Sequence, residues 1–263
     1  MRIPYYFVFC ALFTFMGCDT QSAGKNAEKE TSPSEYTANP AASGFNELAS
    51  DTEAIVIADS VMLAMGGRQA WDDARYFRWN FFNRRALLWD KKTGDVRITM
   101  LPDSNTTMVF NLHSGEGQAR VDGQLITHPD SLQALLSQGR SIWINDAYWV
   151  FMPFKLKDSG VTLKYKGVDT TAAGARADLL QLTFEEIGDT PQNKYLVWVD
   201  KEEHLVRQWA YFAEATDESP AFVIPWQNYQ DYNGLQLSGD RGERKITGIE
   251  LPGNLPDEAF RLE

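Results

Sequence analysis

Residues 55–95, IVIADSVMLAMGGRQAWDDARYFRWNFFNRRALLWDKKTGD, contain a change of hydrophobic period that decides the fold. Apolar side chains recur at roughly helical spacing in the first part of this stretch: Ile55, Ala58, Met62 and Met65. Gly66 and Gly67 follow them, and glycine readily takes the left-handed conformation found at helix C-termini. The stretch therefore begins as an amphipathic helix that ends at the glycine pair.

After the glycines the hydrophobic period becomes two, which is typical of a strand with one buried face. The residues on one face are aromatic: Phe77, Trp79 and Phe81. A hairpin follows, with a strand over 87–90, a turn over 91–94 and a second strand over 96–100. One helix packed on a sheet with an aromatic face is the predicted theme of the domain.

Two helices are expected in the middle of the chain. The first begins at Pro129 and ends at Gly139. The second covers 141–151, is rich in aromatic residues and is closed by Pro153. We expect these helices to interrupt the sheet and to cover it.

Strand patterns account for much of the remaining chain. They are expected at 105–112, 118–121, 161–166, 180–184, 195–199, 205–212, 222–226 and 246–251. The dipeptide Asn233-Gly234 is the strongest short hairpin signal. About a dozen strands with few helices predict an α+β, mainly β fold, in which a large curved antiparallel sheet forms a half-barrel covered by two or three helices.

The N-terminus has the pattern of an exported protein. Residues 3–16 are almost wholly apolar, and Gly17 precedes Cys18. This resembles a bacterial lipoprotein signal, in which the chain is cut before the cysteine and the cysteine is acylated. The alternative is an ordinary secretory signal with an incidental cysteine. We predict a signal peptide over 1–17 and lipidation at Cys18.

The segment after Cys18 is polar and rich in small residues, which predicts a flexible tether over 18–50. Residues 51–263 are then a single half-barrel domain of ordinary size. Since Cys10 lies in the signal and Cys18 carries lipid, the mature domain has no thiol for a disulfide, a nucleophile or a metal site. The expected location is the bacterial cell envelope, lipid-anchored, facing the periplasm or at the outer membrane.

Charge and motifs argue against several classes of function. The formal net charge of −11 argues against a nucleic-acid partner. No metal-ligand spacing links His113, His128 and His204, and no serine-nucleophile elbow or phosphate-binding glycine loop is present. We therefore predict a protein that is not an enzyme and has no metal or cofactor.

Three features together resemble a known superfamily. They are the helix ending in Gly-Gly before an aromatic strand, YWVFMPFKLKDSGV at 148–161, and YQDYNGL at 229–235. The chain resembles the lipoprotein-carrier superfamily of bacterial envelopes, with LolA/LolB-like and RseB-like domains, as an uncharacterised branch. The resemblance spans roughly residue 53 to the C-terminus. It implies an incomplete barrel with helices as a lid and an apolar interior for acyl chains.

Binding of a lipid or acyl chain is the leading functional hypothesis, because a curved sheet of this size encloses more volume than a few helices readily fill. Strand parity and aromatic density predict the cavity lining: Phe77, Trp79, Phe81, Leu87, Trp89, Ile98, Met100, Met108 and Phe110 as an inner wall, with Trp143, Trp149 and Phe154 at the lid. The first alternative is a module that binds an envelope protein partner or senses stress, as RseB-like domains do. An enzyme acting through unfamiliar residues is the second alternative.

Overall fold

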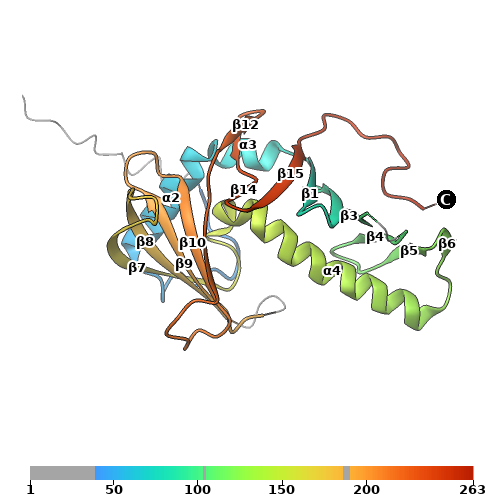
Figure 1. Cartoon of the computed structure of the whole chain (residues 1–263), viewed down its shortest axis with the longest axis horizontal. Coiled ribbons are helices and arrows are strands. Elements are labelled where there is room, and N and C mark those ends of the chain that lie inside the picture. Colours follow the sequence, from blue (N-terminus) through green and yellow to red (C-terminus); the bar gives the residue numbers. More distant parts are fainter. Residues whose placement is uncertain (1–38, 103–104, 186–189, 263) are drawn as a thin grey trace, which may run out of the picture. The chain divides into compact units, whose positions relative to one another are not determined.

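The structure is a computed structural model that describes residues 39–102, 105–185 and 190–262 (Figure 1). The predicted signal peptide, Cys18 and most of the predicted tether lie outside these ranges. The described helices are α2 (Thr52–Ala64), α3 (Gly67–Asp73), α4 (Pro129–Phe151) and the 3-10 helix η1 (Met152–Lys155). No helix in the described ranges is both long and apolar enough to cross a bilayer.

The larger sheet has eight antiparallel strands in the order β14-β15-β1-β2-β3-β4-β5-β6. Their bounds are β1 Tyr76–Phe81, β2 Arg85–Asp90, β3 Asp95–Met100, β4 Thr107–Asn111, β5 Gly117–Val121, β6 Gln124–Leu125, β14 Asp240–Arg241 and β15 Arg244–Glu250. Phe77 lies opposite Trp89, and Trp79 lies opposite Leu87. Residues directly opposite each other share a face, so the predicted aromatic face is confirmed.

A second sheet has five antiparallel strands in the order β11-β10-β9-β8-β7. They are β7 Val161–Thr170, β8 Arg176–Phe184, β9 Lys194–Asp200, β10 Val206–Phe212 and β11 Phe222–Pro225. A two-stranded sheet pairs β12 (Gln230–Tyr232) with β13 (Leu235–Leu237). Its turn is the predicted Asn233-Gly234, and both residues have positive φ, as a tight hairpin requires.

The predicted α+β, mainly β, antiparallel class is confirmed. The described strands are distributed over three sheets rather than one. The 23 residues of α4 lie between β6 and β7 in the chain, and these two strands belong to different sheets.

The middle of the chain forms one helix, so the prediction of two helices divided at Gly139 was wrong. Gly139 is buried inside α4 because that helix packs closely on β4. A Cβ at position 139 would lie 2.8 Å from a ring carbon of Phe110 and 3.2 Å from the Met108 sulfur. Here glycine provides close helix-to-sheet contact, and the helix continues through it.

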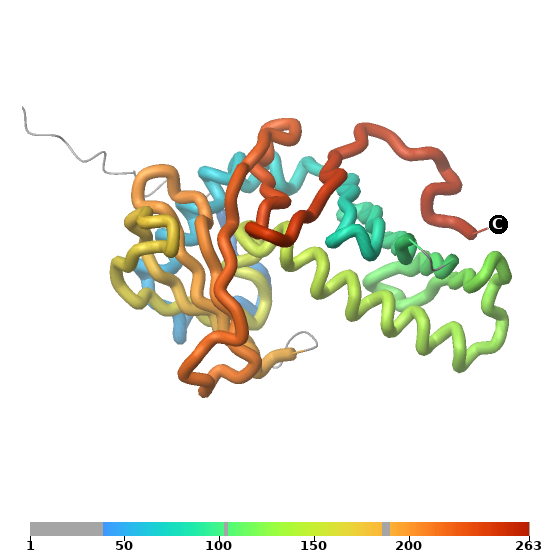
Figure 2. The backbone as a smooth tube through the Cα atoms, in the orientation of Figure 1, coloured from blue at the N-terminus to red at the C-terminus, as the bar shows by residue number. Residues whose placement is uncertain are grey.

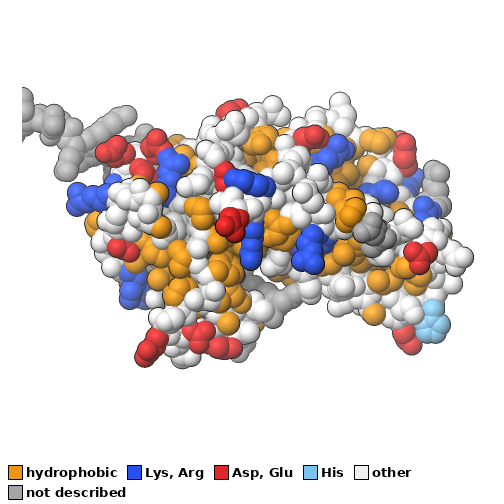
Figure 3. Space-filling view, in the orientation of Figure 1, with side chains coloured by type: hydrophobic (Ala, Val, Ile, Leu, Met, Phe, Trp, Pro, Cys, Tyr) orange, Lys and Arg blue, Asp and Glu red, His pale blue; other side chains and the backbone are white. Residues whose placement is uncertain are grey.

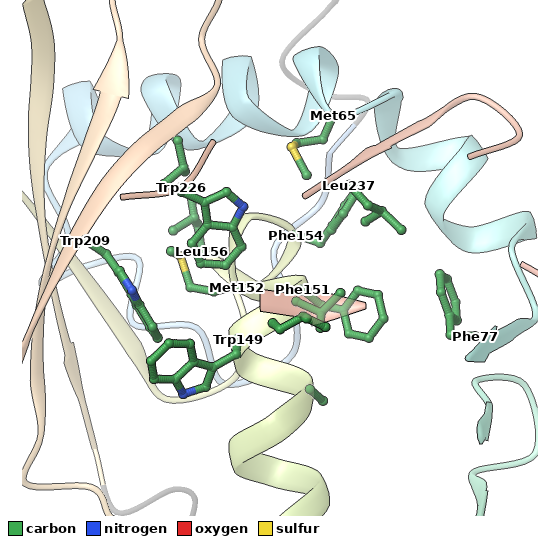
Figure 4. Close-up of a cluster of buried hydrophobic side chains, with 14 of the residues drawn as sticks. Met65, Phe77, Trp149, Phe151, Met152, Phe154, Leu156, Trp209, Trp226 and Leu237 are labelled. Carbon is green, nitrogen blue, oxygen red and sulfur yellow. The ribbon is translucent and has the colours of Figure 1, made fainter. Parts of the chain in front are cut away.

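The end of α4 lies in a core shared by the two larger sheets (Figure 4). Trp149 points toward Trp209 of β10, with ring centroids 5.1 Å apart and nearly perpendicular. Two positions on, Phe151 points toward Phe77 of β1, with centroids 4.9 Å apart. Neighbouring residues of one helix end therefore pack against different sheets, which makes the two sheets parts of one hydrophobic core.

The described chain begins with a segment that contacts this domain. Asn39 donates from Nδ2 to Asp59 Oδ1 of α2 at 2.7 Å, and Asp59 also pairs with Lys157. The Ala42 amide donates to the Lys157 carbonyl at 3.0 Å. Residues 39–50, which the sequence analysis assigned to the tether, are thus hydrogen-bonded to the domain.

The glycine pair after α2 provides a matched test of the fold. Both Gly66 and Gly67 have positive φ, but a Cβ at position 66 would lie 2.1 Å from the Gly234 carbonyl oxygen, whereas nothing lies within 4 Å at position 67. Gly67→Ala is expected to lower the free energy of unfolding by about 1–2 kcal/mol through backbone strain alone. Gly66→Ala is expected to cost clearly more, because the hairpin backbone must also move. Urea denaturation of the two variants measures the difference, and equal losses would contradict this packing.

Candidate functional site

The structure brings the predicted cavity residues together on one face of the eight-stranded sheet and on the helices against it. The buried members are Phe77, Trp79, Phe81, Leu87, Trp89, Ile98, Met108, Phe110, Trp149 and Phe154. Met100 and Trp143 are partly buried and pack against the same cluster. The grouping follows the predicted strand parity.

These side chains are occupied by contacts with the protein's own helix. Phe151 of α4 lies against Phe77, and its ring centroid is 5.4 Å from that of Trp79. Earlier in α4, Trp143 makes an edge contact with Trp89, with ring centroids 5.3 Å apart. The space that the sequence analysis assigned to a ligand is filled here by α4. The prediction placed Phe151 in a covering helix but did not recognise it as the side chain that fills this space.

A pocket of about 290 Å³ lies on the opposite face of the same sheet. It is lined by Arg78, Ala86, Leu87, Leu88, Arg97 and Thr99 of β1–β3 and by Leu255, Pro256 and Ala259 of the C-terminal segment. Apart from Leu87, the strand residues lie on the face away from α4, since Arg78 pairs with Leu88 and Leu88 with Arg97 across the strands. The floor is aliphatic and two arginines lie at its border.

Residues 251–262, the C-terminal segment, form no strand, and Leu255, Pro256 and Ala259 of this segment line the pocket. Figure 2 shows the segment leaving β15 as a loop that ends at the C-terminus. Arg97 Nη1 donates to the carbonyl oxygens of Ala259 and Arg261 at 3.2 and 3.4 Å. The Leu262 amide donates to Gln118 Oε1 at 3.0 Å, and the Leu262 side chain is buried. A few hydrogen bonds and aliphatic contacts hold the segment on the sheet.

The arginines around the pocket differ in whether they have an acidic partner. Arg78 forms an exposed ion pair with Glu250 at 3.1 Å. Burial lowers the pKa of Arg97 below its usual value, and the nearby positive charge of Arg120 lowers it further. Arg120 has a buried Nε without a hydrogen-bond partner. Neither Arg97 nor Arg120 has an acidic partner within the described ranges.

The described part of the chain shows no group of three or more His, Cys, Asp or Glu side chains placed to hold a metal ion. Its fully buried carboxylate, Asp146 of α4, is engaged by Arg85 through two hydrogen bonds at 2.7 and 2.9 Å. Burial raises the pKa of Asp146, and Arg85 opposes that shift. This carboxylate is thus held by a salt bridge inside the domain, which is a structural role.

No family model matches the chain, and no curated protein matches it. Among solved structures, it is similar to a DUF1329 family protein from Desulfovibrio piger, with 12% identity and a TM-score of 0.45 over 79% of this chain and 96% of that one. It is also similar to a LolA superfamily protein from Nitrosomonas europaea, with 10% identity and a TM-score of 0.39 over 77% and 96% of the two chains. A third is a putative outer membrane lipoprotein-sorting protein domain from Vibrio parahaemolyticus, with 8% identity and a TM-score of 0.34 over 71% and 88%.

Proposed function

We propose that this protein is a lipid-anchored envelope lipoprotein that binds a lipid or an acylated ligand and does not catalyse a reaction. The observation that supports it is the pocket of about 290 Å³ between the eight-stranded sheet and the C-terminal segment. Its floor is aliphatic, which suits an alkyl chain. This site replaces the cavity expected on the α4 side, which α4 fills.

The size of the pocket limits what enters it. Ligand pockets start at roughly 300 Å³, so this one suits a short chain or the end of a longer one. Burying about eight methylenes at about 0.8 kcal/mol each contributes about 6 kcal/mol before association costs. That gain supports reversible binding, as a carrier or sensor of lipids requires.

The anchor is proposed from the sequence. Cleavage before Cys18 and acylation of its thiol leave residues 19–38 as the tether, because residues 39–50 contact the domain. A flexible chain of about 20 residues reaches roughly 25 Å root-mean-square. The domain then stays near the membrane while the pocket remains accessible.

Filling the pocket tests the binding site. Ala86 lies on the pocket floor, and Ala86→Phe in the mature chain carrying Cys18→Ser is expected to weaken binding of a fluorescent fatty acid at least tenfold. Leu125→Phe, at an exposed position of β6, is the matched control and should bind as the parent does. Fluorescence titration measures both, and native mass spectrometry of the purified parent should show a co-purified lipid. Unchanged binding by Ala86→Phe in a folded protein would place the ligand elsewhere, and a parent that binds no lipid would contradict the proposal.

Binding of an envelope protein partner is the second candidate, favoured by the outer face of the five-stranded sheet. Hydrophobic side chains gather over β8–β10 in Figure 3. Exposed Val223 of β11 lies opposite Ala210 of β10, on the face that carries the small apolar cluster Ala177, Trp198, Ala210 and Phe212. Recovery of one stoichiometric protein partner, lost in Val223→Asp, together with the absence of lipid would favour this candidate.

A further inference from the structure

We infer, on the basis of the proposed function, that the pocket ligand is an amphiphile with an anionic head, whose carboxylate or phosphate oxygens bind Arg97 and Arg120 while its alkyl chain lies on the aliphatic floor. The C-terminal segment is then the part of the protein that the head displaces. Three observations support this: the placement of the arginines, the lack of acidic partners for them in the described ranges, and the neutral carbonyl oxygens that now accept from Arg97.

The aliphatic floor and the two arginines occupy neighbouring positions across the strands, on one face of the sheet. Leu88 on the pocket floor is opposite Arg97 of β3, and Arg97 is opposite Val109 of β4. Val109 is opposite Gln118 of β5, and Arg120 is two positions further along β5 on the same face. An alkyl chain on the floor therefore places its head at Arg97, with Arg120 further across the same face.

Within the ranges that the structure describes, these two cations have no acidic partners, although the chain carries a formal net charge of −11. Glu250 is used by Arg78. Asp95, on the same face of β3, accepts hydrogen bonds from Asn111 and Thr93. A guanidinium prefers a carboxylate or phosphate, which it binds through two parallel hydrogen bonds. A buried N–H without a partner, such as Arg120 Nε, is costly, so an anion here gains interactions that the protein alone does not provide.

The present acceptors of Arg97 are neutral and exchangeable. They are two backbone carbonyl oxygens of the C-terminal segment, at 3.2 and 3.4 Å. A charged acceptor makes a stronger hydrogen bond than a carbonyl does, so ligand oxygens compete well with them. When the segment loses these contacts, the pocket opens along its length.

The test compares three ten-carbon probes that differ in the head: decanoate, decyl phosphate and 1-decanol. Calorimetric titration uses the full mature chain with Cys18→Ser. At least one anionic probe is expected to bind at least tenfold more tightly than decanol. Preference for decanoate indicates a fatty acid as the natural source, and preference for decyl phosphate indicates a phospholipid.

Amino-acid substitutions then identify the residues that bind the anionic head group. Arg97→Gln is expected to remove most of the preference for the anionic probe over decanol. Arg140→Gln is the matched control, because Arg140 also donates to a backbone carbonyl, that of Leu112, but lies on α4. It should retain the preference. If Arg97→Gln does not fold, Arg120→Gln takes its place, with the same loss expected.

The outcomes separate this inference from the proposed function. Equal binding of all three probes overturns the anionic head and leaves lipid binding in place. An anionic preference that survives both Arg97→Gln and Arg120→Gln overturns the assigned arginines. If none of the probes binds, this inference and the proposed function both fail.

Discussion

Replacing Phe151 with alanine is expected to lower the free energy of unfolding by about 3–5 kcal/mol, the range found for fully buried phenylalanines. Phe151 is 2% exposed and lies against both Phe77 and Trp79 of β1. Removing its ring leaves a void between α4 and the sheet that the surrounding aromatic side chains cannot easily close. Urea denaturation followed by far-UV circular dichroism measures the loss.

This variant also measures how tightly the face covered by α4 is packed. Leu63→Ala serves as the control, because Leu63 is 61% exposed on α2 and its truncation should change stability by no more than about 0.5 kcal/mol. A loss below about 1 kcal/mol for Phe151→Ala would indicate a loosely packed interior of the kind expected from the sequence. A large loss means that α4 belongs to the core, and that a ligand on this side would have to displace it.

Replacing Arg85 with alanine is expected to cost about 3–5 kcal/mol at neutral pH, because it leaves a buried carboxylate without its cation. The Asp146 side chain has no exposed surface, and Arg85 holds it through two hydrogen bonds. Asn145 alone remains as a hydrogen-bond donor to it among the side chains described. Thermal and urea denaturation of the variant measure the cost.

The stability lost in Arg85→Ala should increase as the pH rises. Burial raises the pKa of Asp146 in the folded protein above its ordinary value of 3.8, and loss of Arg85 removes the main opposing effect. The folded state then binds more protons than the unfolded state between the ordinary pKa and the raised one, so stability falls as pH rises through that window. Arg85→Ala is therefore expected to be least damaging near pH 4 and most damaging above the raised pKa.

A double variant provides the control for the charge. Arg85→Met with Asp146→Leu replaces both partners by apolar groups and should recover most of the stability, without this pH dependence. If Arg85→Ala were as stable as the parent at pH 7, or equally damaged at pH 4 and pH 7, the buried ion pair would not have the role assigned to it.

Local signals in the sequence predicted the secondary structure well where short-range chemistry controls it. The alternation from Phe77 to Phe81 placed the aromatic face, because side chains alternate along any strand. Asn233-Gly234 predicted a hairpin whose turn needs positive φ at both residues. Gly139 misled the prediction, because a helix also accepts glycine where a neighbouring strand approaches closely.

The pocket was harder to predict from the sequence, although one pattern in β2 pointed to the face on which it lies. Leu87, Leu88 and Trp89 are consecutive apolar residues in β2, a pattern typical of a strand covered on both faces. It indicated a second buried face, and it is on this face that the pocket lies. Nothing nearby in the sequence shows that residues 251–262 cover it, because those residues form no strand and contact the sheet across more than 140 positions of the chain.

The sequence by itself determined which residues form strands, which of them share a face, and where the tight turns lie, because these depend on neighbours a few positions apart. Only the tertiary structure decided what occupies each face of the eight-stranded sheet. The α4 side is filled by Phe151 and its neighbours, and the opposite side is covered by the C-terminal segment. Strand parity predicts that a face is apolar, but the element that covers it is selected by the packing of the whole chain.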